Sequence, residues 1–405
     1  MRRPLLATMT SLLLVAAAAG PAAAVDVPPP APSPTDSGVS PAAPDPHPPR
    51  GGIGPDGEAV GGQRLLSRGV VRPKGAPALP HGLTARGWVL ADLGTGDILA
   101  ARDPHGRYQP ASILKILTSD TLIPKLPGDE RVTVSAAAAN TEGSHAGLVA
   151  NGRYRIDDLF RGLLLVSGND AAVALAQAAG GVGRTVAAMN AEALSLGAYD
   201  TFVQTPSGLD GWQQLTSAYD MMLFLRKALT LPRFVAYDRT AAAKLPAQHP
   251  PATALDPVPM ANQNEQFLTT VPGALVAKTG YTDAAQHTFA GAIRRRGRTL
   301  AVIFLRAQRW PTDQWQQATT LLNWGFALPA GTAPVGHLDA PVTPPAGSPT
   351  PSASTRRAAA AGAIGGGRDP FTVPAVVTTT LAVLATVALA VKRRRYRRRP
   401  APARR

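Results

Sequence analysis

Three short motifs hold the side chains of this chain that are best suited to chemistry. In chain order they are Ser112-Ile113-Leu114-Lys115, Ser167-Gly168-Asn169 and Lys278-Thr279-Gly280. In the first, the spacing of three residues places the serine and the lysine on one face of a helix, one turn apart. A lysine at that distance can accept the proton of the serine hydroxyl, which makes the hydroxyl a nucleophile. The first motif therefore predicts nucleophilic catalysis, with Ser112 as the attacking group and Lys115 as its base.

Lys115 can act as a base only if its pKa is lowered. With the usual lysine pKa of about 10.4, removing the proton at pH 7 costs about 4.6 kcal/mol. Burial or a second cation lowers the pKa of a lysine, and Lys278 is the candidate for that cation. Only seven of the 41 Lys and Arg residues are Lys, and two of these seven lie in the motifs. Because an Arg cannot release its proton near neutral pH, this use of Lys fits proton transfer.

Each motif also has a purely structural interpretation. Ser112 can cap a helix that carries Lys115 on its solvent face. Gly168 and Asn169 can end one helix and begin the next, and Lys278-Thr279-Gly280 can be a turn at the end of a strand. At average composition, about one or two S-x-x-K matches are expected by chance in a chain of this length. All three structural interpretations would have to hold at once, so the ordered trio favours a functional site.

The hydrophobic pattern predicts strands at both ends of one domain and helices between them. Turn residues between apolar runs predict two β-hairpins, over residues 88–102 and 288–305. Apolar residues at helical spacing predict helices over residues 112–123, 156–166, 171–179, 185–196, 217–229 and 312–324, the last ended by Gly325. This order predicts an α+β fold, in which an antiparallel sheet joins the two ends of the domain and is covered by helices.

The net charge of +15 gathers at the chain ends rather than on one binding surface. Residues 392–405 hold nine Lys and Arg with no acid, and Arg2 and Arg3 add two more, so about four positive charges remain for the rest. A surplus of this size does not indicate a nucleic-acid groove. The absence of Cys excludes a disulfide scaffold, a thiolate nucleophile and any Cys-ligated zinc or iron–sulfur site.

Both ends of the chain have the features of membrane-topology signals. A basic start, an apolar run and Ala22-Ala23-Ala24 predict a secretory signal peptide over residues 1–24, in preference to an uncleaved anchor. Residues 371–391 carry no charge and, as a helix, would reach roughly 30 Å, the thickness of a bilayer core. Basic residues stay on the cytoplasmic side, so the tail over residues 392–405 is predicted to be cytoplasmic. We therefore predict a single-pass protein of the cell membrane with its folded domain outside the cytoplasm.

Composition divides the remaining chain into one folded domain and two linkers. Residues 25–76 are rich in Pro and Gly, and residues 328–370 are rich in Pro, Ala and Gly. Neither stretch has the hydrophobic periodicity of a packed segment, so both are predicted to be disordered. Residues 77–327 remain as the predicted catalytic domain, long enough to bury a substantial core.

The residues around the motifs resemble the serine D-alanyl-D-alanine carboxypeptidases of peptidase family S11, the low-molecular-mass penicillin-binding proteins. The segments that carry the resemblance are Thr95-Gly96, Arg107-Tyr108-Gln109-Pro110-Ala111-Ser112, Ser167-Gly168-Asn169-Asp170-Ala171 and Lys278-Thr279-Gly280-Tyr281-Thr282. It covers residues 87–324, and its ordered motifs are specific. The resemblance implies a β-lactamase/transpeptidase-like fold with a mostly helical subdomain. The Arg- and Ala-rich composition is typical of an actinobacterial member.

The resemblance also implies a role for each motif residue in removing the terminal D-alanine from peptidoglycan stem peptides that end in D-Ala-D-Ala. Ser112 would be the acylated nucleophile, Lys115 its base, and Ser167 the relay of a proton to the leaving D-alanine. The substrate-binding residues would be Asn169, Lys278 and Thr279. The backbone N–H groups of Ser112 and Tyr281 would form the oxyanion hole. The resemblance also implies that β-lactam antibiotics acylate the enzyme as inhibitors. It implies no cofactor, no metal and no nucleic-acid partner.

Two features depart from the pattern of the family. Ile113 and Leu114 stand where relatives often have Thr or Met before the lysine, which bears on fine specificity more than on chemistry. Many relatives carry a β-rich second domain before a C-terminal amphipathic anchor. Here a linker and an apolar span take those places.

Several other functions are open or disfavoured. A DD-endopeptidase or transpeptidase shares the acylation step and differs only in the nucleophile that reaches the acyl-enzyme. A class A serine β-lactamase needs a Glu in an E-x-x-L-N segment, and Glu192-Ala193-Leu194-Ser195 lacks the Leu-Asn. A non-catalytic wall-binding relic has no need of two motif lysines. A Ser-His-Asp hydrolase is disfavoured because the sequence has no G-x-S-x-G motif, and His287 lies in a predicted strand, where a packed or exposed histidine is expected. Metal catalysis is disfavoured because the sequence has neither an H-E-x-x-H motif nor clustered ligands.

Overall fold

The structure is a computed structural model of the chain, and it describes residues 51–246, 257–329 and 331–338. These residues lie in the first of two structural units, which spans residues 1–341. The predicted signal peptide, the first part of the N-terminal linker, and the predicted C-terminal span and tail lie outside the described residues. Within the described ranges, no helix has both the length and the apolar character needed to cross a membrane.

A seven-stranded sheet runs through the fold in the order β1-β3-β2-β10-β9-β8, with β11 paired to β3. The strands are β1 Val70–Val71, β2 Gly87–Asp92, β3 Asp97–Arg102, β8 Ala274–Thr282, β9 Gln286–Arg295, β10 Arg298–Ala307 and β11 Gly336–His337. Both predicted hairpins are present, as β2–β3 and β9–β10. The predicted junction of the two ends of the domain is confirmed, because β2 and β10 pair antiparallel with Val302 opposite Leu90.

Two smaller antiparallel pairs lie outside this sheet. They are β4 Arg131–Thr133 with β5 Arg153–Arg155, and β6 Ala242–Leu245 with β7 Val258–Ala261. None of these strands was predicted, because strands of three or four residues are too short to show a period of two in the sequence.

The longer helices follow the predicted segments, with shifts of a few residues at their ends. They are α1 Lys115–Leu122, α3 Ile156–Leu165, α4 Asn169–Ala178, α5 Val182–Ser195, α6 Ala218–Ala228 and α9 Gln314–Ala327. A 3₁₀ turn, η2 Ala111–Leu114, precedes α1 and takes up the first residues of the helix predicted there. The short helices α2 Ala136–Ala139, α7 Pro232–Asp238 and α8 Glu265–Thr270 were not predicted.

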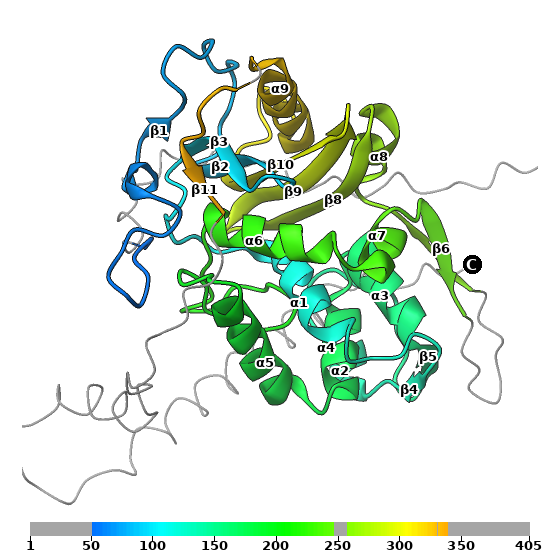
Figure 1. The fold of residues 1–405 in the computed structure, drawn as a ribbon. Coiled ribbons are helices and arrows are strands. Elements are labelled where there is room, and N and C mark those ends of the chain that lie inside the picture. The colour runs from blue at the N-terminus through cyan, green and yellow to red at the C-terminus, as the bar shows by residue number, and fades with distance from the viewer. Residues whose placement is uncertain (1–50, 247–256, 330, 339–405) are drawn as a thin grey trace, which may run out of the picture. The chain divides into compact units, whose positions relative to one another are not determined.

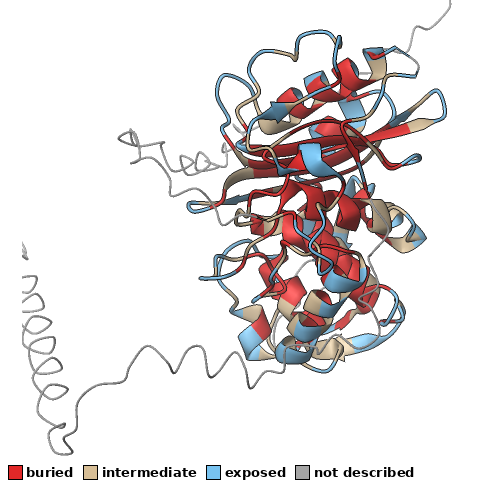
Figure 2. Ribbon diagram, turned by 60° about the vertical axis from the view of Figure 1, so that its left-hand side comes forward, coloured by how far each residue is buried: buried red, intermediate tan, exposed pale blue. Residues whose placement is uncertain are grey.

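Side chains of the sheet alternate between two hydrophobic cores, one on each face. On one face, Ala301 and Ile303 of β10 belong to the core that the α1 and α6 side chains share. On the other face, Val302 of β10 packs in a core with Leu321 of α9 and Phe267 of α8. Figure 1 shows α9 on one side of the sheet and the larger group of helices on the other. Buried residues follow the sheet and the helices against it in Figure 2.

Gly325 does not end helix α9, contrary to the prediction. The helix continues to Ala327, and the glycine faces the sheet. A Cβ atom at this position would lie 2.9 Å from Leu90 Cδ2 and 3.0 Å from Leu300 Cδ1. The missing side chain therefore allows α9 to pack closely on β2 and β10.

Residues 51–76 pack against the domain, so the prediction of a disordered linker is wrong for this part of it. Leu65, in the 3₁₀ turn η1 Gln63–Leu66, is fully buried, and β1 pairs with β3. The backbone N–H of Gly52 donates to Asp200 Oδ1 at 3.0 Å. Composition misleads here because a few isolated anchors fix a segment that is otherwise polar and rich in Gly.

The folded part also extends beyond residue 327, where the second linker was predicted to begin. Strand β11 pairs with β3, with Gly336 opposite Ile98. Val335 and Leu338 are buried. The short apolar anchors of this segment are too sparse to produce a periodic pattern in the sequence.

Replacing Leu65 by Ala tests whether residues 51–76 are part of the cooperative fold. We expect Leu65→Ala to lower the free energy of unfolding by about 2–5 kcal/mol, because it leaves a cavity in a packed core. The neighbouring Leu66 is 38% exposed, so Leu66→Ala is expected to cost no more than about 0.5 kcal/mol. Urea unfolding of both variants measures the difference, and equal costs would contradict the packing of this segment.

Candidate active site

Ser112 lies in the 3₁₀ turn that leads into α1, with glycines close to its backbone. The preceding Ala111 has φ 48°, in the left-handed region that few non-glycine residues adopt. A Cβ atom at Gly208 would lie 2.0 Å from the carbonyl oxygen of Ala111, and one at Gly280 would lie 2.6 Å from the backbone nitrogen of Ser112. Two segments far away in the sequence therefore approach the serine backbone closely enough to require glycine.

Lys115 is fully buried and its Nζ meets three acceptors. It donates to Ser112 Oγ at 2.9 Å, to Asn169 Oδ1 at 2.8 Å and to the carbonyl oxygen of Ser207 at 2.7 Å. The structural alternative, in which Lys115 lies on a solvent face, is wrong. Loss of one proton from this amine leaves a lone pair within reach of the Ser112 hydroxyl.

The pKa of Lys115 is lowered well below its usual value. Burial is the largest cause, because an ammonium group loses its hydration there. The charge of Lys278 lowers the pKa further, as the sequence predicted, and the carboxylate of Asp170 raises it. The environment thus favours the neutral amine that a general base requires.

The turn between α3 and α4 brings Ser167 and Asn169 to the same place. Ser167 has φ 60° and is 3% exposed, and its hydroxyl has no hydrogen-bond partner in the described part of the chain. Asn169 is the first residue of α4, and its side chain does not cap the helix. Instead its Nδ2 donates to the carbonyl oxygen of Glu142 at 2.7 Å while its Oδ1 accepts from Lys115. Asn169 therefore holds Lys115 in place and lies beneath the surface of the cleft.

Asp170, directly after this motif, fixes the loop beside it. One carboxylate oxygen accepts from the backbone N–H of Ala146 at 2.8 Å. The other accepts from Gly147 and Leu148, each at 3.0 Å. Through these three backbone hydrogen bonds, the buried carboxylate holds the loop against the start of α4.

Lys278, Thr279 and Gly280 lie within β8, at the edge of the sheet, and do not form a turn at the end of a strand. Lys278 is 1% exposed, and its Nζ donates to the carbonyl oxygen of Thr279 at 2.8 Å. The Thr279 hydroxyl accepts from Gln314 Nε2 at 3.0 Å, at the start of α9. The edge strand thus presents Thr279 and the Gly280 backbone next to Ser112.

Burial also shifts the pKa values of Lys278 and of a carboxyl group near it. It lowers the pKa of Lys278 to about 8, against the opposing charge of Asp238. It raises the pKa of Asp238 to about 7, although the N–H of Ala277 donates to this carboxylate at 2.8 Å. At neutral pH Lys278 therefore stays largely protonated, while Lys115 is driven toward its neutral form.

A cleft of about 420 Å³ lies over these groups. Its lining consists of Ser112, Ser144, Ser167, Gln263, Gln266, Thr279, Gly280, Tyr281, His287, Arg309, Asp313, Gln314 and Trp315. Four of the expected site residues line the cleft, namely Ser112, Ser167, Thr279 and Tyr281. The other three are buried, namely Lys115, Asn169 and Lys278.

Sequence reasoning missed several residues of the site because no motif marks them. Ser207, whose carbonyl oxygen accepts from Lys115, lies in the long loop after α5. Arg309 lies between β10 and α9, and Gln314 is the first residue of α9. His287 is half-buried in β9, with its ring centroid 4.6 Å from that of Tyr281. The register of β8 with β9 places these two residues opposite each other, which the predicted hairpins did not reveal.

One cluster of potential metal ligands, which the sequence did not reveal, occurs among the described residues: His105, Asp200 and Asp220. Its members are bonded to protein groups. His105 Nδ1 lies 2.7 Å from Asp200 Oδ2, and Asp220 Oδ2 accepts from the backbone N–H of Asp200 at 2.9 Å. His105 Nε2 also lies 3.1 Å from the carbonyl oxygen of Val60. The cluster is therefore a structural network that fastens residues 51–60 to the domain.

Comparisons with known proteins agree with this geometry. The family model for D-alanyl-D-alanine carboxypeptidases of peptidase family S11 matches residues 74–309. The D-alanyl-D-alanine carboxypeptidase DacB2 of Mycobacterium tuberculosis is 39% identical over 263 residues, which cover 64% of this chain and 87% of that protein. DacD of Salmonella typhimurium is 32% identical over 260 residues, and the match spans 64% of its length.

Solved structures of the same kind are also similar. A D-alanyl-D-alanine carboxypeptidase from Mycobacterium tuberculosis has a TM-score of 0.62 and 38% identity, covering 66% of this chain and 99% of that one. The DD-transpeptidase of Streptomyces K15 has a TM-score of 0.57 and 26% identity, covering 62% of this chain and 100% of that one. The predicted mixed fold, an antiparallel sheet with a helical subdomain, is confirmed by these likenesses.

The influence of Lys278 on Lys115 can be measured directly. Lys278→Met removes a nearby positive charge, so the pKa of Lys115 is expected to rise, while burial keeps it below the usual lysine value. With only seven lysines in the chain, a pH titration of the lysine side chains by NMR resolves this group. Lys244→Met, at an exposed position in β6, is the matched control. An unchanged pKa of Lys115 in Lys278→Met would show that burial alone lowers it.

Proposed function

Because this chain belongs to peptidase family S11, the D-alanyl-D-alanine carboxypeptidases, we propose that it removes the terminal D-alanine from peptidoglycan stem peptides through an acyl-enzyme on Ser112. The observation that carries the proposal is the distance of 2.9 Å between Lys115 Nζ and Ser112 Oγ. It is supported by the burial that lowers the pKa of Lys115. A hydroxyl and a neutral amine at hydrogen-bond distance form a nucleophile with its base.

In the acylation step, Lys115 takes the proton from Ser112 while Oγ attacks the carbonyl carbon of the penultimate D-alanine. The backbone N–H groups of Ser112 and Tyr281 then stabilise the negative charge on the carbonyl oxygen. The close contact of Gly280 with the Ser112 nitrogen supports this pairing, because it brings the β8 backbone beside that N–H. Formation of the Oγ–C bond is followed by cleavage of the C–N bond to the terminal D-alanine.

The leaving amine needs a proton, and Ser167 is its proposed donor. Its hydroxyl lies in the cleft lining without another partner, so its proton can be donated and then replaced by the one that Lys115 removed from Ser112. Thr279 contributes a hydroxyl to bind the terminal carboxylate, and the protonated Lys278 beneath it adds a positive field. Water then hydrolyses the ester with Lys115 again as the base, which restores Ser112.

The same nucleophile is proposed to be acylated by β-lactam antibiotics. A β-lactam presents a strained amide carbonyl, and the attack by Ser112 opens its ring without releasing a separate leaving group. The absence of an E-x-x-L-N segment from the sequence supports slow hydrolysis of this ester, unlike that in a class A β-lactamase. A transpeptidase differs in the last step only, since an amine replaces water as the acceptor.

The central test is Ser112→Ala, assayed for D-alanine release from a peptide that ends in D-Ala-D-Ala and for labelling by a fluorescent penicillin. Both activities are expected to fall to background, because the other two acceptors of Lys115 Nζ, Asn169 Oδ1 and the carbonyl oxygen of Ser207, cannot replace the serine hydroxyl as a nucleophile. Ser195→Ala, at an exposed position away from the cleft, is expected to retain both. D-Alanine release that persists in Ser112→Ala would refute the mechanism. Penicillin labelling of the wild type without D-alanine release would indicate a transpeptidase.

The enzyme is further proposed to act outside the cytoplasm, anchored by one C-terminal span. The support is sequence: a secretory signal over residues 1–24, and an apolar run over residues 371–391 followed by basic residues. A tether of this kind keeps the catalytic domain near a wall polymer that cannot diffuse to it.

Two truncations test the anchor. A chain that ends at residue 370 lacks the apolar run, so it is expected in the culture medium. A chain that ends at residue 391 keeps the run and loses only the basic tail, so it is expected in the membrane fraction. Cell fractionation followed by penicillin labelling measures both. Retention of the shorter chain in the membrane would contradict the anchor.

A further inference from the structure

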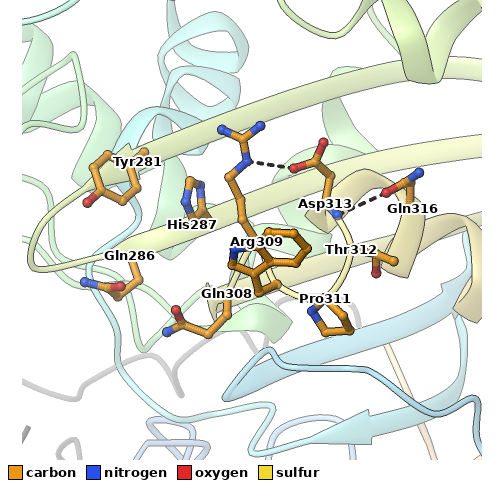
Figure 3. Close-up of a pocket in the computed structure, with 10 residues that line it drawn as sticks. Tyr281, Gln286, His287, Gln308, Arg309, Pro311, Thr312, Asp313 and Gln316 are labelled. Carbon is orange, nitrogen blue, oxygen red and sulfur yellow. Dashed lines mark hydrogen bonds and ion pairs between the residues drawn. The ribbon is translucent and has the colours of Figure 1, made fainter. Parts of the chain in front are cut away.

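A second cavity of about 680 Å³ adjoins the active-site cleft. The two share Tyr281, His287, Arg309 and Asp313 in their linings. We call it the Trp310 cavity, after the tryptophan in its own part of the lining. Figure 3 shows Tyr281 and His287 on one side of it and the Arg309–Asp313 pair on the other. The reacting D-Ala-D-Ala unit binds in the cleft, so the Trp310 cavity is available to another part of the substrate.

Trp310 is 77% exposed, although the segment that carries it is fixed at both ends. Gln317 Nε2 donates to the carbonyl oxygens of Gln308 at 2.8 Å and Thr312 at 2.7 Å. Asp313 and Gln316 form a capping box at the start of α9. A large aromatic side chain on a fixed backbone is partly preorganised to contact a ligand, because little backbone freedom is left to lose.

The polar lining of the Trp310 cavity is rich in amide groups, and its Arg and Asp side chains pair with each other. Arg309 Nε donates to Asp313 Oδ1 at 2.7 Å, so the two charges balance each other. Three glutamines, Gln286, Gln308 and Gln316, add their side-chain amides to the lining. Planar amides beside exposed aromatic rings match a neutral ligand that has many hydroxyl or amide groups and an apolar face. A sugar ring has this combination, whereas a stem peptide carries free charges.

We propose that the Trp310 cavity binds an N-acetylated sugar of the glycan strand that bears the stem peptide. The proposal rests on the proposed function for the identity of that strand. Four residues of extended peptide span at most about 14 Å, so the sugar that bears the peptide can reach a cavity that adjoins the cleft. The ring of Trp310 would stack on the apolar face of the sugar, and the glutamine amides would bond its hydroxyl and acetamido groups.

Binding is tested first without any reaction. The full-length chain, purified in a detergent without a sugar headgroup, is titrated with the N-acetylglucosamine tetramer and observed by ligand-detected NMR. We expect saturation of the ring protons by the wild type and a loss of about three- to tenfold in affinity in Trp310→Ala, as one aromatic contact contributes. Trp212→Ala is the matched control, because Trp212 is 88% exposed and lines neither cavity.

Kinetics then separates a sugar site from a peptide site. For each variant, kcat/KM is measured on a disaccharide-pentapeptide and on the same pentapeptide without sugar. The proposal predicts that Trp310→Ala lowers the ratio of the two values about three- to tenfold and that Trp212→Ala leaves the ratio as in the wild type. An equal loss on both substrates would overturn it in favour of a peptide site. If the wild type does not bind the tetramer, the proposal is overturned even when the carboxypeptidase activity is present. If Ser112→Ala still binds the tetramer, the sugar site is supported independently of that activity.

Discussion

Burial of Lys115 is the constraint on which the rest of the site depends. Removing an ammonium group from water costs several kcal/mol unless it is well hydrogen-bonded, and oxygens of Ser112, Asn169 and Ser207 bond its Nζ. These three residues come from separate parts of the chain, so the lysine finds its partners only when the helical part has assembled. The burial that requires these partners also lowers the pKa of Lys115. The burial that only the assembled fold provides is therefore also what leaves the amine neutral and able to accept a proton.

The edge strand β8 completes the site because the two hydrophobic cores hold the sheet from both faces and leave this edge beside the helices. At the junction the backbones approach so closely that side chains are excluded at Gly208 and Gly280. Ala111 and Ser167 take left-handed conformations there. Each such residue costs about 1–3 kcal/mol and persists only where the surroundings determine it. Here the surroundings are the packed sheet on one side and helices α1 and α4 on the other.

The segment before β2 contributes to the same assembly. His105 and Asp200 connect it to the domain. Arg107, five residues before the nucleophile, has its Nε 3.3 Å from Asp200 Oδ1, so the same carboxylate holds the segment that leads to Ser112. Burial raises the pKa of the neighbouring Asp220 well above its usual value, and the charge of Asp200 adds to this effect. A region of linker-like composition is thus fastened near the start of the catalytic segment.

The sequence alone predicts the chemistry of the site and much of the order of the helices and strands. Ser112 and Lys115 are three positions apart, so helical geometry alone places them together, and long periodic runs identify the main helices and hairpins. The groups that surround this pair are visible only in the folded chain. Asn169 positions Lys115 beneath the cleft, and Gln314 bonds Thr279, because these contacts arise from packing between distant segments that no local pattern encodes. The linker boundaries were misplaced for the same reason, since a few anchors such as Leu65 gain their burial from residues far along the chain.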